Sequence, residues 1–63
     1  MCLAKAFLKK DNKEEFLIEN VASVDILDKK LILTTILNET KEVEANIKRI
    51  DFENANILLE VCN

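Results

Sequence analysis

Apolar and polar residues alternate along much of this chain with the period of two that is typical of β-strands. The clearest stretch covers residues 42–48, where Val43, Ala45 and Ile47 alternate with polar residues. Elsewhere, runs rich in β-branched and apolar residues are separated by asparagine, aspartate and lysine. The pattern predicts six strands, near residues 2–9, 14–19, 21–28, 30–37, 41–51 and 55–61.

Six short strands with hairpin-sized connections predict an all-β fold, a small SH3-like barrel that makes one domain of residues 1–63. Ile50 and Phe52 continue the alternation after a shift of one position, which indicates a bulge or bend near Lys48-Arg49. A helix from Lys41 to Asn54 is an alternative interpretation, because the apolar residues there also fit a helical stripe.

The connections must be made without glycine or proline, since the chain contains neither. Tight hairpins often need a residue with positive φ, and asparagine and aspartate tolerate this conformation better than other non-glycine residues. We therefore expect Asn12, Asn38 and Asn54 to take that role in the turns.

The length of 63 residues limits the core that the chain can build. A domain of this size buries only about 60% of the surface that its unfolded chain exposes, so a metal, disulfides or oligomerisation usually add stability. Two cysteines are too few for a disulfide-rich secreted scaffold. A second copy of the chain or a metal ion is therefore an expected source of stability.

Composition also limits the setting and the partners. No segment approaches the roughly 20 apolar residues of a membrane span, and lysines interrupt the first residues where a signal peptide would be apolar. We expect a cytoplasmic protein with reduced thiols. The net charge of −3 argues against nucleic acid as a partner.

The candidate for chemistry is Cys2, which directly follows Met1. The Met1 amine, the deprotonated Cys2 amide and the Cys2 thiolate form two fused five-membered chelate rings around one ion. Such rings favour a square plane, which suits Ni(II) or Cu(II) better than tetrahedral Zn(II). If an aminopeptidase removes Met1, Cys2 keeps an amine and a thiolate in one ring. A small buried structural thiol is the alternative for Cys2.

Other polar residues are expected to be solvated or structural. Alternation places Glu42 and Glu44 on the polar face of a strand, and a domain this small has little room for a catalytic cleft. The basic pairs at 9–10, 29–30 and 48–49 fall at turns, strand ends or the expected bulge, where they protect sheet edges. RNA binding also calls for exposed aromatic residues. The three phenylalanines, Phe7, Phe16 and Phe52, are expected in the core instead.

The beginning Met1-Cys2-Leu3-Ala4-Lys5 resembles that of the CooT family, small proteins that open with Met-Cys, an apolar residue and alanine. Further similar segments are Glu14 to Val24, Leu33-Thr34-Thr35, Lys41-Glu42-Val43-Glu44 and Ile50-Asp51-Phe52 to Leu59-Glu60. The resemblance implies an SH3-like barrel, a homodimer and nickel bound through Cys2. It also implies nickel delivery to carbon monoxide dehydrogenase, although some members carry a generic RNA-binding label.

The chain departs from this family in its glycine-free turns and in Cys62, which has no counterpart in the family motif. A Cys2–Cys62 disulfide is conceivable if the terminal strands pair, although a reducing cytoplasm argues against it. The resulting hypothesis is a non-enzymatic, homodimeric protein that stores or delivers Ni(II), with Cys2 and the Met1 amine as ligands. The alternative is a barrel that binds RNA or protein, in which Cys2 is purely structural.

Overall fold

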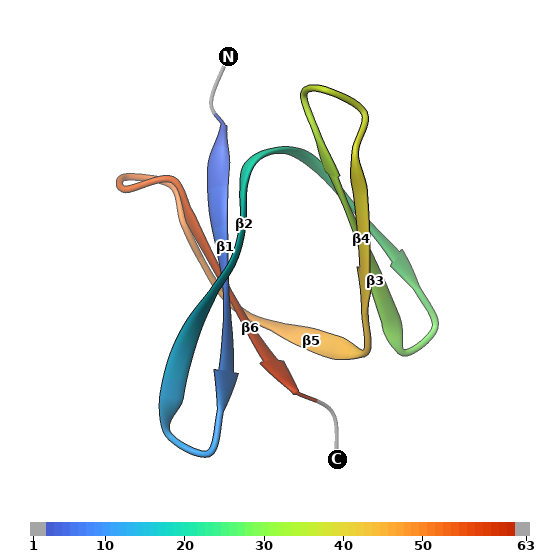
Figure 1. Cartoon of the computed structure of the whole chain (residues 1–63). Coiled ribbons are helices and arrows are strands. Elements are labelled where there is room, and N and C mark those ends of the chain that lie inside the picture. The colour runs from blue at the N-terminus through green and yellow to red at the C-terminus, as the bar shows by residue number, and fades with distance from the viewer. Residues whose placement is uncertain (1–2, 62–63) are drawn as a thin grey trace.

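The computed structural model describes residues 3–61, which form six β-strands and no helix (Figure 1). The strands are β1 (Ala4–Lys10), β2 (Lys13–Leu27), β3 (Lys30–Thr35), β4 (Thr40–Val43), β5 (Ala45–Asp51) and β6 (Asn56–Val61). The predicted all-β class and the number of strands are confirmed, and the helix considered for residues 41–54 is wrong. Two boundaries differ from the prediction, because 14–19 and 21–28 form one strand and 41–51 is divided at Glu44.

The long strand β2 continues through Asn20, which the sequence suggested as a turn. Asn20 has a φ of 60°, but the pairing with the neighbouring strands resumes on both sides of it. The register of β2 shifts twice against β1 and once against β3, and extra residues of this kind bend and twist a strand. Asn20 therefore curls the strand instead of ending it.

The strands form one sheet in the order β4-β3-β2-β1-β6-β5, which curls into an SH3-like half-barrel (Figure 1). All neighbours are antiparallel except β1 and β6, which run parallel. A register shift between Ile47 and Arg49 of β5 confirms the bulge predicted near residues 48–49. The edges of the sheet are β4 and β5, joined through Glu44 alone.

A small hydrophobic core lies inside the curl of the sheet. Its buried members come from β1, β2, β3, β5 and β6: Ala6, Val21, Leu31, Leu33, Ala45, Ile57 and Leu59. Leu33 and Leu59 have 0% exposure, and Leu31 has 2%. Beside the core, the buried Thr35 hydroxyl accepts hydrogen bonds of 3.2 Å from the backbone amides of Leu37 and Glu39. This holds the β3–β4 turn in one conformation.

The turns use asparagine, aspartate and, in one case, alanine where glycine is usual. Asn12 and Asn38 have φ values of 68° and 64°, which confirms their predicted role. The prediction for Asn54 is wrong, because the residue with positive φ in the turn between β5 and β6 is Ala55, at 54°. The Asn54 side chain instead donates a hydrogen bond to Asp51. The positive φ strains the backbone of Ala55, because alanine has a Cβ atom that disfavours the left-handed conformation.

Replacing Ala55 with glycine is expected to stabilise the fold. The left-handed conformation costs an L-residue roughly 1–2 kcal/mol, and part of this gain is offset by the entropy of glycine in the unfolded chain. The expected net gain is about 0.5–1 kcal/mol, or a melting temperature about 4 °C higher. Thermal unfolding followed by circular dichroism measures it. The control Ala22→Gly changes a strand alanine without positive φ and should lower the melting temperature.

Candidate metal site and the surface at the chain start

The residues proposed as metal ligands, Cys2 and Met1, lie outside the described residues 3–61, as does Cys62. The structure places the chain start, defined here as Leu3 and Ala4. Ala4 pairs with Val21 of β2, and the next amide, that of Lys5, donates a 2.9 Å hydrogen bond to the carbonyl of Ala55. The chain start therefore lies between the middle of β2 and the β5–β6 turn (residues 52–55).

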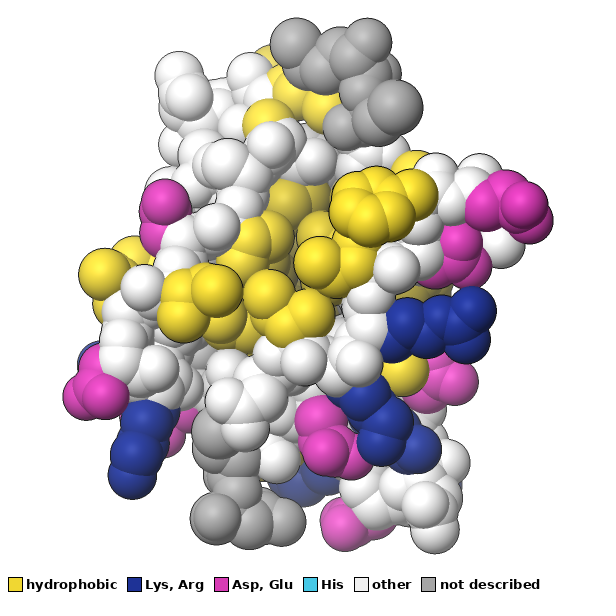
Figure 2. Space-filling view, turned by 180° about the vertical axis from the view of Figure 1, so that it is seen from behind, with side chains coloured by type: hydrophobic (Ala, Val, Ile, Leu, Met, Phe, Trp, Pro, Cys, Tyr) yellow, Lys and Arg dark blue, Asp and Glu magenta, His cyan; other side chains and the backbone are white. Residues whose placement is uncertain are grey.

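An apolar groove of about 320 Å³ lies beside the chain start. It is lined by Ala4, by residues 21–24 of β2, and by residues 50–52 and 55–57 around the β5–β6 turn. Eight of these eleven lining residues are apolar, the exceptions being Ser23, Asp51 and Asn56. Figure 2 shows hydrophobic side chains gathered around a hollow on one face of the molecule, with charged side chains mostly toward its edge.

Large apolar side chains are exposed at this groove. Ile50 is 46% exposed and Phe52 is 88% exposed. Phe16, on the outer surface of the sheet, is 54% exposed and makes an edge-to-face contact with Phe7, with 5.9 Å between the ring centroids. The expectation that Phe16 and Phe52 belong to the core is therefore wrong. Ile50 lies near the end of β5, paired with the core residue Ile57, and Phe52 directly follows this strand in the β5–β6 turn.

The turn that carries Phe52 is held by Asp51. Its carboxylate accepts hydrogen bonds from the backbone amides of Glu53 and Asn54, both at 3.1 Å, and from the Asn54 side chain at 3.0 Å. The side-chain hydrogen bond of Asn54 is the largest cause that lowers the pKa of Asp51 below its ordinary value. The amide of Asn54 adds to this effect. Phe52 is thus presented on a preorganised turn.

These hydrogen bonds predict an acid-sensitive turn. Because the pKa of Asp51 is lower in the folded chain, its contribution to stability is present above the ordinary value of 3.8. That contribution is lost as the pH falls through the lower folded value. We expect Asp51→Asn to lower the melting temperature at pH 7 and to reduce its fall between pH 5 and pH 2. Asp25→Asn, at an exposed aspartate of β2, is the control and should not reduce this fall.

The carboxylates within residues 3–61 do not form a metal site. No group of three or more His, Cys, Asp or Glu side chains in that part of the chain converges on one point. Glu42 and Glu44 are exposed as predicted, and Glu42 pairs with Lys30 at 3.2 Å across the sheet. Glu60 pairs with Lys48 at the same distance. Among the basic pairs, these two lysines therefore make cross-strand ion pairs on the surface.

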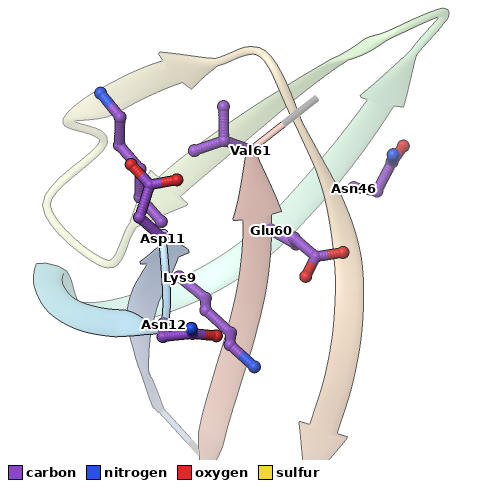
Figure 3. Close-up of a pocket in the computed structure, with 7 residues that line it drawn as sticks. Lys9, Asp11, Asn12, Asn46, Glu60 and Val61 are labelled. Carbon is purple, nitrogen blue, oxygen red and sulfur yellow. The ribbon is translucent and has the colours of Figure 1, made fainter. Parts of the chain in front are cut away.

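A larger hollow of about 600 Å³ lies where β1 and β6 end (Figure 3). Its charged residues are of both signs: Lys9, Lys10, Asp11 and Glu60. Figure 3 shows the side chains of Lys9, Asp11 and Glu60 pointing in different directions and not toward a common centre. This hollow therefore has no arrangement suited to one ion or one substrate group.

Comparison with known proteins decides the family. The model of the family described as CO dehydrogenase accessory protein CooT matches residues 1–60. The chain belongs to the CooT family. A crystal structure from Carboxydothermus hydrogenoformans that is assigned to CooT has 34% sequence identity and a TM-score of 0.89, covering 98% of this chain and 100% of the other. No curated protein matches the chain.

The CooT match separates the two cysteines. It includes Met1 and Cys2 and ends before Cys62, in agreement with the absence of Cys62 from the family motif. The exposed phenylalanines remove one argument against nucleic-acid binding. The carboxylates of Glu14, Asp51 and Glu53 near them in sequence, and the net charge of −3, still oppose it.

The strand order of this CooT family member also bears on the Cys2–Cys62 disulfide. The terminal strands do pair, but in parallel, so Lys9 faces Glu60 and the beginning of β1 lies far from the end of β6 (Figure 1). At about 3.3 Å per residue, the seven steps from Leu3 to Lys10 span roughly 23 Å. Cys2 and Cys62 themselves lie outside the described residues, so the bond between them, which the sequence left conceivable, stays untested by these strand positions.

No helix capable of crossing a membrane occurs in the described part of the chain. The CooT family model describes an accessory protein, which agrees with the expectation of a non-catalytic role. It also implies an enzyme as the partner that is assisted, carbon monoxide dehydrogenase by the family's description.

Proposed function

We propose that this protein binds Ni(II) through Cys2 and stores it or delivers it to a nickel enzyme, carbon monoxide dehydrogenase by its family. In this proposal the protein is a cytoplasmic homodimer without catalytic activity of its own. Each chain supplies the Cys2 thiolate, with the Met1 amine and the Cys2 amide as further donors. Nickel is the cargo, and the barrel positions the residues that hold it.

The donors present in the chain support Cys2 as the ligand. The sequence has no histidine, and residues 3–61 bring no three metal-binding side chains together. Thiolate and deprotonated amide are strong donors that favour a square plane, the geometry of Ni(II) and Cu(II). The family match begins at residue 1 and so includes both proposed ligands.

The observation that carries the proposal is the position of the chain start at the edge of the apolar groove. Ala4, two residues after Cys2, lines the groove. One thiolate in each chain is an incomplete metal site. A second copy that covers the groove by two-fold symmetry would bring the two chain starts toward one another. The surface that favours association and the residues that bind nickel are then parts of one interface.

Titration of the purified protein with Ni(II) tests this proposal through its stoichiometry. A shared site is expected to saturate at one ion per two chains, with thiolate-to-metal absorption that rises to this ratio and then stays constant. Light scattering on the same samples gives the molar mass. Saturation at one ion per chain, or a monomer both with and without nickel, would contradict the shared site.

A further inference from the structure

The turn between β5 and β6 presents the most exposed aromatic side chain of the described residues. Phe52 is 88% exposed, whereas the phenylalanine at position 7 is half-buried. Three hydrogen bonds to the Asp51 carboxylate fix the backbone that carries it. An exposed aromatic residue on a hydrogen-bonded turn is typical of the anchors that dominate protein–protein binding, because little backbone entropy is lost when it is buried.

The apolar groove lies immediately beside this anchor. Phe52 forms part of its wall, and the rest of the groove is built by Ala4, Val21, Val24, Ile50 and Ile57. Ala22 and Ser23, which also line it, are exposed, so the groove opens to the surface along β2. The volume of about 320 Å³ is sufficient for an aromatic side chain with some surrounding atoms.

We propose that Phe52 of each chain inserts into the apolar groove of a second copy and so forms the centre of a two-fold interface. This inference rests on the proposed homodimer and adds the surface and the residue that form it. Phe52 and the groove lie side by side on one face of the chain. An isologous contact requires this arrangement, because Phe52 of each chain then contacts the groove of the other.

Size supports a second copy as the occupant. A standard interface covers about 800 Å² of each partner, which is about a sixth of the 4784 Å² surface of one chain. Among the described residues, the large side chains with 2% exposure or less are Leu31, Leu33 and Leu59. Covering Ile50, Phe52 and the groove supplies the apolar burial that so small a core lacks.

The groove position links this anchor to the metal. Because Ala4 lines the groove, an interface centred on Phe52 includes the chain start of each copy. Phe52 is not a metal ligand, yet its removal is expected to weaken nickel binding, because it separates the two halves of the shared site. A purely structural role of Phe52 within the monomer would not produce this effect, since its side chain is exposed there.

The test compares dimer dissociation constants of the full-length protein without metal, by light scattering and analytical ultracentrifugation. Phe52→Ser is expected to raise the constant at least about 30-fold, the effect of removing an interface anchor. Ala22→Lys places a charge in the groove and should act in the same direction. The control Leu37→Ser removes another large exposed side chain, 74% exposed on the β3–β4 turn, and should leave the constant unchanged. Circular dichroism verifies that each variant is folded.

Nickel titration of the same variants separates this inference from the proposed function. A dimer that Phe52→Ser and Ala22→Lys leave intact overturns the inference, whatever nickel does. A monomeric wild-type chain also overturns it, as does a dimer that Leu37→Ser weakens equally. A dimer that depends on Phe52 but binds no nickel supports the inference and contradicts the metal proposal. Weaker nickel binding in Phe52→Ser, with the Leu37→Ser titration unchanged, supports both.

Discussion

Replacing Cys2 by serine is expected to abolish nickel binding at micromolar concentrations. The change removes the one thiolate that each chain contributes to the proposed site and leaves a hydroxyl that does not ionise near neutral pH. Loss of a group that only supports a ligand typically costs 10–100-fold in metal affinity, so loss of the ligand itself should cost at least about 100-fold. The thiolate-to-metal absorption should disappear with it.

Cys62→Ser is the matched control for this change. It removes the other thiol of the chain, which lies beyond the end of the family match at residue 60. We expect the nickel affinity and the absorption spectrum of this variant to equal those of the wild-type protein. Undiminished nickel binding in Cys2→Ser would contradict the metal site. It would favour the alternative of a barrel that binds RNA or protein, for which a salt-dependent RNA affinity is the direct test.

The Met1 amine can be tested separately from the thiol. Addition of two residues before Met1 converts its amine into an amide and moves the new amine out of chelating distance. If the amine is a ligand, nickel affinity should fall and the square-planar absorption bands should shift, while the free thiol content stays the same. An unchanged spectrum would restrict the ligands to the thiolate and the backbone amide of Cys2.

The strand pattern could be predicted from the sequence because alternation reports burial directly. The segment 42–48 gave the correct face for Val43, Ala45 and Ile47, and the shift after it gave the bulge of β5. Asn20 misled the prediction because asparagine in a left-handed conformation serves both in turns and in bulges. Only the pairing partners, which lie far away in the sequence, decide between the two.

The groove could not be predicted by the same means. Alternation correctly assigns Ile50 to the inner side of β5, opposite Ile57, but does not tell where the barrel ends. Ile50 is 46% exposed although it pairs with the buried Ile57, and Phe52, in the turn after the strand, is 88% exposed. Phe16 faces outward against Phe7, where the sheet has no covering layer. The metal site proposed at Cys2, in contrast, could be suggested from the sequence alone, because its candidate chelating groups are adjacent in the chain and need no fold to bring them together.

The second large effect expected is the loss of the fold on replacing Leu33 by alanine. Leu33 has 0% exposure and lies in the small core with the other buried leucines, Leu31 and Leu59. Truncation of a buried leucine to alanine costs about 2–5 kcal/mol, and the core of a domain this small rarely supplies more than about 3–5 kcal/mol. The variant is therefore expected to be largely unfolded as a monomer at room temperature.

Urea unfolding followed by far-ultraviolet circular dichroism measures this effect, since the chain has no tryptophan or tyrosine for fluorescence. Leu37→Ala is the matched control: it deletes the same atoms from a side chain that is 74% exposed, and should change the free energy of unfolding by less than about 0.5 kcal/mol. Leu33→Ile, which conserves volume, should cost less than about 1.5 kcal/mol.

Repeating the titrations at several protein concentrations separates the two sources of stability, association and the packing of the core. Association raises the urea midpoint with concentration, whereas packing around Leu33 acts equally at every concentration. A cost below about 1 kcal/mol for Leu33→Ala would mean that association and not the core of the single chain maintains the fold.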